Sequence, residues 1–171
     1  MAVKLIAMDL DGTLMSSDHI TVTEKTKKAL LKAHHLGIKT AIATGRTLSV
    51  IGNVLEQVPF IDYVIYSNGA SVFDRCKGEN VYTSAIPSET VSRLVAVLES
   101  YPVYYELYAG GCIHSQADKG KYFKNKDLPQ EFLDFYLENI KNHASLSEYA
   151  EKNDIEKINL FYFGGEFYDE I

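Results

Sequence analysis

The stretch Asp9-Leu10-Asp11-Gly12-Thr13-Leu14 follows a short apolar run at residues 3–8. An apolar run closed by a turn signal is typical of a buried parallel strand. Because residues two apart in extended backbone point to one side, Asp9 and Asp11 are expected to reach one pocket. Two neighbouring carboxylates are unfavourable unless a cation neutralises them or one takes a proton. Mg²⁺ suits such oxygen ligands, and Gly12 allows close backbone approach to an anion. An ordinary Asp-Gly turn is the alternative, but Asp-x-Asp-Gly-Thr is far more specific.

The same arrangement of an apolar run followed by a polar cluster occurs twice more. Residues 38–43 predict a second buried strand that ends at Thr44-Gly45-Arg46. Residues 62–66 predict a third strand that ends at Ser67-Asn68-Gly69-Ala70. Ligands bind at the carboxyl ends of the strands in parallel α/β sheets. We therefore expect all three polar clusters to lie at one edge of the sheet.

Two helices are predicted between these strands. Thr21 and Glu24 fit a capping box, with Thr21 as N-cap, and Gly37 is expected to stop the helix that follows. Its buried stripe is predicted to hold Ala29, Leu30, Ala33 and Leu36. A second helix is marked by Leu48, Ile51, Val54 and Leu55. This β-α-β-α-β succession predicts a doubly wound α/β core with a parallel sheet.

The pattern changes after about residue 74. A hairpin turn is predicted at 74–80, helices at 88–100 and 130–142, and strands at 103–108 and 157–163. The first of these helices is predicted to have Ser88 as its cap and to bury Val91, Leu94, Val95 and Leu98. This half is expected to form a separate α+β lid. We predict a partial core domain at 1–82 and a cap domain at 83–171.

Composition narrows the class of protein. The chain has 171 residues, a net charge of −6 and 46% hydrophobic residues, as is ordinary for a globular protein. The negative charge argues against a nucleic-acid partner. No stretch is long and apolar enough for a signal peptide or a membrane span, so we expect a cytoplasmic protein without membrane contact. Cys76 and Cys112 are interpreted as two free thiols.

Three motifs resemble those of the haloacid dehalogenase superfamily. Asp9-Leu10-Asp11-Gly12-Thr13-Leu14 resembles its first motif, and Ile42-Ala43-Thr44-Gly45-Arg46 resembles the second motif of its Cof-type sugar phosphatase branch. Ser67-Asn68-Gly69-Ala70 is similar to the Asn-Gly segment of that branch. The resemblance implies a Rossmann-like, doubly wound parallel sheet with an inserted α+β cap, and an incomplete core here.

The resemblance also implies a role for each residue. Asp9 would attack phosphorus, form an aspartyl-phosphate and ligate Mg²⁺, while Asp11 would shuttle a proton and give the metal its backbone carbonyl. Thr44 would bond a phosphoryl oxygen, with the following helix N-terminus turned toward the anion. The residues assigned to substrate and phosphate binding are Leu10, Gly12, Thr44, Gly45, Arg46 and Asn68.

Two of these roles have an alternative. Arg46 either steers substrate or forms a structural ion pair. Asn68 either bonds the metal-site loop or the substrate, or satisfies the backbone of its own turn. Asp11 favours a phosphatase over a dehalogenase, because a halide leaving group needs no proton donor.

Two further parts of the family's chemistry, a lysine and an acidic Gly-Asp loop, have no match in the sequence. Residues 165–170 carry acids but follow the lid half, so we interpret them as a decoy. Lys119, Lys121, Lys141 and Lys157 are interpreted as solvated surface lysines. The chain therefore resembles an N-terminal portion that ends inside the cap. Its core is expected to have an open sheet edge and to associate with itself or with a complementary chain.

The favoured hypothesis is a Mg²⁺-dependent phosphatase of small phosphorylated metabolites such as a sugar phosphate, nucleotide or cofactor phosphate. A catalytically incompetent fragment and a sugar phosphomutase are the alternatives. In the lid, Tyr101, Tyr104, Tyr105 and Tyr108 are interpreted as a sheet face packed on helices rather than a substrate pocket. His114 is interpreted as structural.

Overall fold

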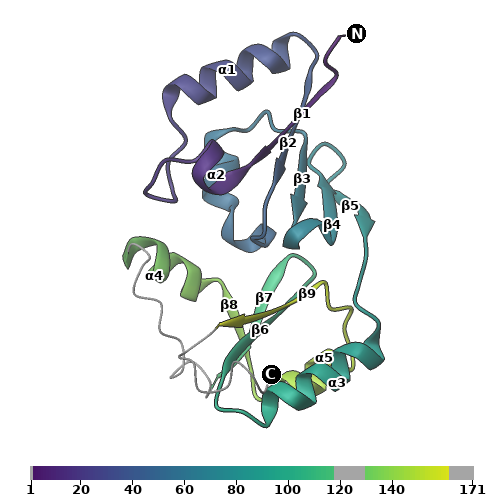
Figure 1. The fold of residues 1–171 in the computed structure, drawn as a ribbon. Helices are drawn as coiled ribbons and strands as arrows, with labels where there is room; N and C mark the ends of the chain where they lie inside the picture. Colours follow the sequence, from purple (N-terminus) through teal and green to yellow (C-terminus); the bar gives the residue numbers. More distant parts are fainter. Residues whose placement is uncertain (1, 118–129, 162–171) are drawn as a thin grey trace.

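The computed structural model of the chain describes residues 2–117 and 130–161. It contains two sheets, each covered by helices (Figure 1). The first sheet has the strand order β1-β2-β3-β4-β5 and the second the order β8-β7-β6-β9. The fold is a mixed α/β fold with parallel strands, as predicted.

The elements of the first unit, residues 2–83, are β1 (Leu5–Asp9), the turn η1 (Leu10–Leu14), α1 (Glu24–His35), β2 (Lys39–Ala43), η2 (Leu48–Val50), α2 (Gly52–Gln57), β3 (Tyr63–Tyr66), η3 (Ser67–Gly69), β4 (Ser71–Asp74) and β5 (Glu79–Thr83). The elements of the second unit are α3 (Ser88–Glu99), β6 (Tyr104–Ala109), β7 (Cys112–Gln116), α4 (Gln130–Glu138), β8 (Ile140–His143), α5 (Leu146–Ala150) and β9 (Lys157–Phe161). The division into a core domain and a cap domain at residue 82 stays a prediction.

The three predicted core strands are parallel neighbours. β1 pairs with β2, and β2 pairs with β3, all in parallel register. The predicted turn at 74–80 joins two antiparallel strands, β4 and β5, which extend the sheet beyond β3. Buried side chains from η1, β2, α2 and β3, among them Leu10, Ile42, Val54 and Val64, form the core of this unit.

Strand β1 is the edge of this sheet within the described residues, and its prediction as a buried strand is wrong. Its residues alternate between exposed and half-buried, and 51% of Leu5 is exposed. The reason is that none of the described strands pairs with its outer edge. Among the described strands the expected open edge is therefore present, while self-association through it stays a prediction.

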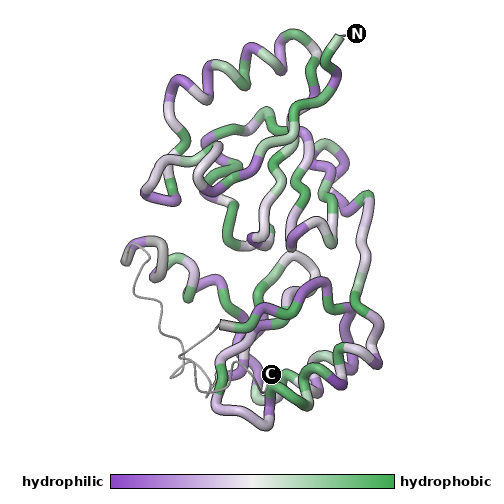
Figure 2. The backbone as a smooth tube through the Cα atoms, in the orientation of Figure 1, coloured by the Kyte–Doolittle hydropathy of each residue, from purple (hydrophilic) through white to green (hydrophobic). Residues whose placement is uncertain are grey.

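The helices differ from the prediction in detail. Thr23 rather than Thr21 caps α1, because its side chain accepts the N–H of Thr26. Ala29 is exposed and Leu36 is 68% exposed, so the buried stripe keeps only Leu30 and Ala33. In α3, Pro87 takes the cap position and Leu94 is exposed. Figure 2 shows hydrophobic and hydrophilic residues interspersed along α1 and α3, as expected of surface helices.

The predicted helix at 130–142 is shorter than expected. It ends at Glu138, and residues 140–143 form β8 instead, parallel to β7. The free edge of β7 accounts for the difference, because pairing there satisfies backbone groups that a longer helix would have bonded internally. None of the helices within the described residues is long and apolar enough to cross a membrane.

Several contacts join the two units. The Gly111 carbonyl, at the tip of the β6–β7 hairpin, accepts the N–H of Ser49 at 3.0 Å. Val50 packs with Tyr108, Ile113 and Tyr136 in one apolar cluster. Two more contacts come from Glu156, the residue before β9, and from Lys157, its first residue. The carboxyl end of the first sheet therefore lies against the second unit.

Candidate active site

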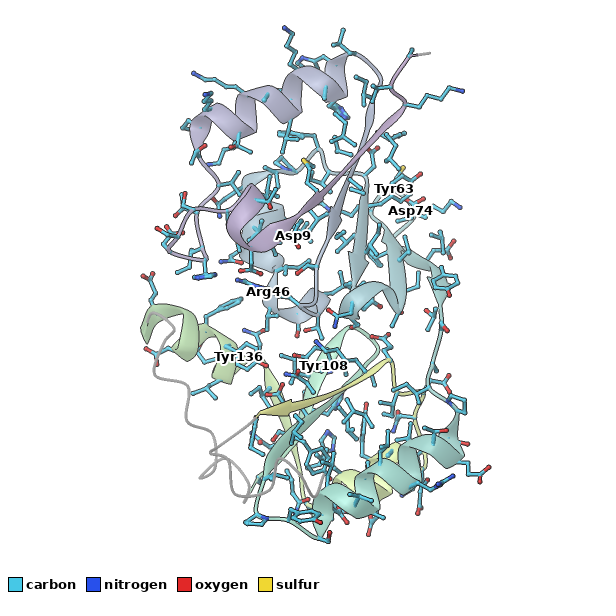
Figure 3. All side chains as sticks on the ribbon, viewed as in Figure 1. Asp9, Arg46, Tyr63, Asp74, Tyr108 and Tyr136 are labelled. Carbon is cyan, nitrogen blue, oxygen red and sulfur yellow. The ribbon has the colours of Figure 1, made fainter. Side chains whose placement is uncertain are left out.

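The three polar clusters meet at one edge of the first sheet, as the strand pattern predicted. Asp9 lies opposite Ala43 in register, directly beside Thr44. The Thr44 N–H donates to the Ile65 carbonyl at 2.8 Å, and the Asn68 N–H donates to the Thr44 carbonyl at 3.2 Å. Figure 3 shows Asp9 and Arg46 at the end of the first unit that faces Tyr108 and Tyr136 of the second.

The Asp11 carboxylate is held by two basic side chains. Arg46 donates through Nε to Oδ2 at 3.0 Å and through Nη2 to Oδ1 at 2.5 Å. The Nδ1 atom of His19 lies 2.9 Å from Oδ1. Asp18 shapes the loop that presents His19, because its carboxylate accepts the N–H groups of Ile20 and Thr21. The two-point contact makes Arg46 an ion-pair partner of Asp11 in this structure, and its role toward substrate stays a prediction.

These contacts set the protonation of Asp11. Partial burial acts to raise its pKa, but the hydrogen bonds and charges of Arg46 and His19 outweigh burial and lower the pKa below its usual value. Asp11 is therefore an ionised carboxylate while Arg46 stays in place. A proton-donor role requires Arg46 to move to another anion.

Residues of the first loop differ in what they can offer a ligand. The side chain of Leu10 is fully buried in the core, so any phosphate contact from Leu10 comes from its backbone. Gly12 has φ +73°, a left-handed conformation that favours glycine. Asp9 is exposed at the end of β1, which leaves its carboxylate accessible to a ligand.

Thr44 and Gly45 lie where the second strand ends. Thr44 is buried, and its Oγ1 accepts the N–H of Arg46 at 3.1 Å, which leaves the hydroxyl proton for donation. A Cβ built on Gly45 would clash with Oδ1 of Asn68, so a larger residue at position 45 would displace the Asn68 amide. The expected helix N-terminus after Thr44 is not formed, because η2 starts at Leu48 and α2 has only six residues.

The second unit turns a polar face toward this edge. By strand register, Glu106, Tyr108, Lys157 and Asn159 share that face. Glu106 is fully buried and accepts the hydroxyls of Tyr104 at 2.9 Å and Tyr136 at 2.7 Å. Tyr105 lies on the opposite face, in the apolar cluster under α3. The prediction that these tyrosines pack on helices therefore holds for Tyr105, whereas Tyr104 and Tyr108 surround the carboxylate of Glu106.

Lys157 is half-buried, so its interpretation as a solvated surface lysine is wrong. Its Nζ donates to the Gly45 carbonyl at 3.3 Å and lies 4.7 Å above the ring of Tyr108. Burial lowers its pKa, an effect that the charge of Glu106 opposes. Lys141 is exposed, as predicted, whereas Lys119, Lys121 and residues 165–170 lie outside the described residues.

Glu106 should make the free energy of unfolding depend on pH. Burial raises its pKa to about 6 from a usual 4.5, against hydrogen bonds from Tyr136 and Tyr104. A raised carboxyl pKa means that the folded state holds the proton more tightly. The contribution of Glu106 to the free energy of unfolding should therefore fall by about 2 kcal/mol as the pH rises from 4.5 to 7.

We expect Glu106→Gln to remove this pH dependence, because glutamine does not ionise. Urea unfolding of both proteins between pH 4.5 and 8 measures the difference. Glu151→Gln, at an exposed position, is the matched control. A difference between wild type and Glu106→Gln that stays constant with pH would contradict the prediction.

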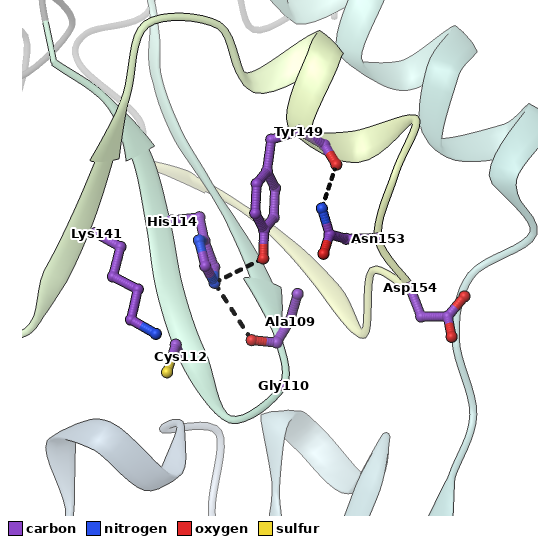
Figure 4. Close-up of a pocket in the computed structure, with 8 residues that line it drawn as sticks. All are labelled: Ala109, Gly110, Cys112, His114, Lys141, Tyr149, Asn153 and Asp154. Atoms are coloured by element: carbon purple, nitrogen blue, oxygen red, sulfur yellow. Dashed lines mark hydrogen bonds between the residues drawn. The ribbon is translucent and has the colours of Figure 1, made fainter.

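His114 lies on the other face of the second sheet, beside a pocket of about 330 Å³ (Figure 4). It is stacked on Tyr149, whose hydroxyl lies 3.0 Å from its Nε2, and its Nδ1 lies 2.8 Å from Nε2 of His143. Burial lowers its pKa to about 4. His114 is thus a neutral packing residue, in line with its structural interpretation. Cys112 lines the same pocket, and both Cys112 and Cys76 are free thiols, as predicted.

Four residues around the site were not assigned to it by sequence reasoning: His19, Glu106, Glu156 and Lys157. His19 had no local signal. For Glu106 the sequence does contain a signal. Tyr104, Glu106 and Tyr108 alternate along one predicted strand, so their side chains must share one face.

The chemistry of the first loop suits Mg²⁺, which prefers oxygen ligands, keeps several waters and is commonly held by one or two carboxylates. The resemblance implies the carboxylate of Asp9 and the backbone carbonyl of Asp11 as donors, and both stay predictions. Within residues 2–117 and 130–161, no three His, Cys, Asp or Glu side chains form a metal-binding group.

The class of protein follows from comparison with known families. The family of haloacid dehalogenase-like hydrolases matches residues 6–170. The chain belongs to that family, and the resemblance drawn from its three motifs is confirmed.

Particular relatives are named phosphatases. Phosphatase YwpJ of Bacillus subtilis is 34% identical over 112 residues, which make up 66% of this chain and 39% of YwpJ. Putative phosphatase YxeH of the same organism is 33% identical over 130 residues, 74% of this chain and 45% of YxeH. The HAD subclass IIB sugar phosphatase BT4131 superposes with a TM-score of 0.70 at 32% identity, over 90% of this chain and 56% of that structure. The chain thus spans less than half the length of these two curated relatives.

Proposed function

We propose that the protein is a Mg²⁺-dependent phosphatase that hydrolyses small phosphorylated metabolites through an aspartyl-phosphate at Asp9. The observation that carries the proposal is the meeting of an accessible Asp9 with Asp11, Thr44 and Arg46 at one sheet edge. The phosphatase relatives support the same class of reaction.

In the first step, a carboxylate oxygen of Asp9 bonds to phosphorus while the ester P–O bond breaks. Asp11 gives its proton to the leaving oxygen, and Thr44 and Arg46 donate to the phosphoryl oxygens. In the second step, Asp11 takes a proton from water, and the resulting hydroxide attacks phosphorus. The bond from phosphorus to Asp9 breaks, which returns the free carboxylate and inorganic phosphate. Bound Mg²⁺ would supply charge neutralisation beside Asp9 and the backbone carbonyl of Asp11.

Arg46 has two competing anions in this scheme. In the structure it pairs with Asp11 and favours the ionised carboxylate. An incoming phosphoryl group attracts the same guanidinium. Transfer of Arg46 to the phosphoryl group removes the main opposition to protonation of Asp11, so substrate binding itself prepares the proton donor.

Release of inorganic phosphate from p-nitrophenyl phosphate and from a panel of sugar phosphates, with and without Mg²⁺, tests the proposal. We expect turnover by the complete gene product that requires Mg²⁺. Turnover by the complete gene product but none by residues 1–171 alone would support the catalytically incompetent fragment, and no turnover by either would contradict the proposed function. Dependence on a sugar bisphosphate with little phosphate release would instead indicate a phosphomutase.

A further inference from the structure

The turn at η3 has an unusual backbone. Ser67, Asn68 and Gly69 have φ values of +50°, +58° and +91°, three left-handed residues in a row. Glycine adopts this conformation freely and asparagine tolerates it, whereas serine does so at a clear energetic cost. Such strain persists only where the surroundings fix it, and it is concentrated at functional sites. Ser67 is therefore the residue that needs support from outside the turn.

That support comes from the second unit. Ser67 is 2% exposed, and its Oγ donates to Oε2 of Glu156 at 3.0 Å. The other carboxylate oxygen, Oε1, accepts the hydroxyls of Ser71 at 3.1 Å and Tyr66 at 3.4 Å. Glu156 is itself buried, and none of the ion pairs among the described residues includes it. Its partners are hydroxyls immediately before, within and after the strained turn.

Turn η3 also fixes the neighbouring loop at residues 44–46. The Ser67 N–H donates to the Arg46 carbonyl at 3.0 Å, and the Asn68 N–H donates to the Thr44 carbonyl. The Asn68 side chain abuts Gly45, whose carbonyl accepts Lys157 from the second unit. Consecutive residues 156 and 157 thus contact the two loops that form the candidate phosphate site.

We propose that Glu156 is a positioning residue, which holds Ser67 in its left-handed conformation and thereby places Asn68 against residues 44–46. The inference rests on the proposed function for the statement that this loop binds a phosphoryl group. The stabilisation of the turn at Ser67 by Glu156 does not depend on the proposed function. In consequence, the second unit must be seated on the first for the site to have this shape.

Amide hydrogen exchange tests the hold on the turn. Glu156→Ala should speed exchange at Ser67 and Asn68 by roughly tenfold or more relative to Val64, a buried residue of β3. Adding Ser67→Gly should restore slow exchange, because glycine needs no support at φ +50°. Glu156→Gln should behave as wild type, since its amide can still bond the three hydroxyls. Glu151→Ala, in the same unit, is the control.

Two serine variants keep the test decisive if Glu156→Ala does not fold. Ser67→Ala and Ser71→Ala each remove one hydroxyl from Glu156, but only Ser67 lies in the turn. We expect faster exchange at Asn68 in Ser67→Ala alone. Equal exchange in both variants, or equal acceleration at Val64, would show that Glu156 gives only general stability and would overturn the proposal.

Binding of inorganic phosphate in the presence of Mg²⁺, measured by calorimetry on the complete gene product, separates this proposal from the function on which it rests. Weaker binding in Glu156→Ala that Ser67→Gly restores supports both. If wild type binds no phosphate while the exchange pattern is as expected, the proposed function fails and the positioning role of Glu156 stands. Unchanged phosphate binding in a folded Glu156→Ala would overturn its role at the site.

Discussion

Replacing Asp9 with asparagine should reduce kcat for p-nitrophenyl phosphate by roughly a thousandfold or more, because the amide cannot supply the attacking oxygen. The side chain is exposed at the end of β1, so the substitution should leave the folded structure and its thermal midpoint unchanged. The loss would then report on chemistry rather than on folding. Steady-state hydrolysis at saturating substrate and Mg²⁺ measures it.

The matched control is Asp154→Asn, which makes the same change at an exposed carboxylate of the second unit. It should retain full activity. If Asp9→Asn keeps more than about a tenth of wild-type turnover, another group is the nucleophile and the proposed mechanism is wrong.

The sequence predicted the site residues that lie close together in the chain or directly after a strand. Asp9 and Asp11 are two residues apart, and Thr44 and Asn68 each follow a predicted strand, so strand topology alone brings them together. The parallel order of β1, β2 and β3 follows from the same apolar runs. These features depend on short-range patterns, which a sequence shows directly.

Contacts between distant segments were not predictable in this way. Glu156 lies 89 residues from Ser67, and Lys157 lies 112 residues from Gly45. Nothing near either residue indicates such a partner, because a lysine or glutamate at the start of a strand is usually solvated. The exposure of β1 was missed for a related reason: its burial depends on a neighbour at its outer edge, not on its own apolar sequence.

The N-cap of α1 differs from the prediction because packing decides between two neighbouring threonines. Thr21-Val22-Thr23-Glu24 offers two threonines to cap α1, and the capping-box spacing favoured Thr21. In the structure Val22 is buried in the core, and this places Thr23 at the helix start. A hydrophobic contact therefore decided between two acceptable caps.

Replacing Asp11 with asparagine should have an effect that depends on the leaving group. An alkyl phosphate expels a strongly basic alkoxide, which needs a proton in the transition state, so kcat/KM should fall by about 10²- to 10⁴-fold. p-Nitrophenolate is a weak base and leaves without protonation, so its kcat/KM should fall far less. Comparing kcat/KM for a sugar phosphate with that for p-nitrophenyl phosphate, in wild type and variant, measures the difference.

Asp9→Asn provides the contrast, because loss of the nucleophile should lower both substrates equally. The amide oxygen of Asp11→Asn can still accept one of the two Arg46 hydrogen bonds, so the guanidinium keeps a partner beside the site although the negative charge is lost. Loss of base catalysis in the second step should also leave more protein as the aspartyl-phosphate. Equal losses of kcat/KM on the two esters would mean that Asp11 acts through its charge and its hold on Arg46, and not as the proton donor.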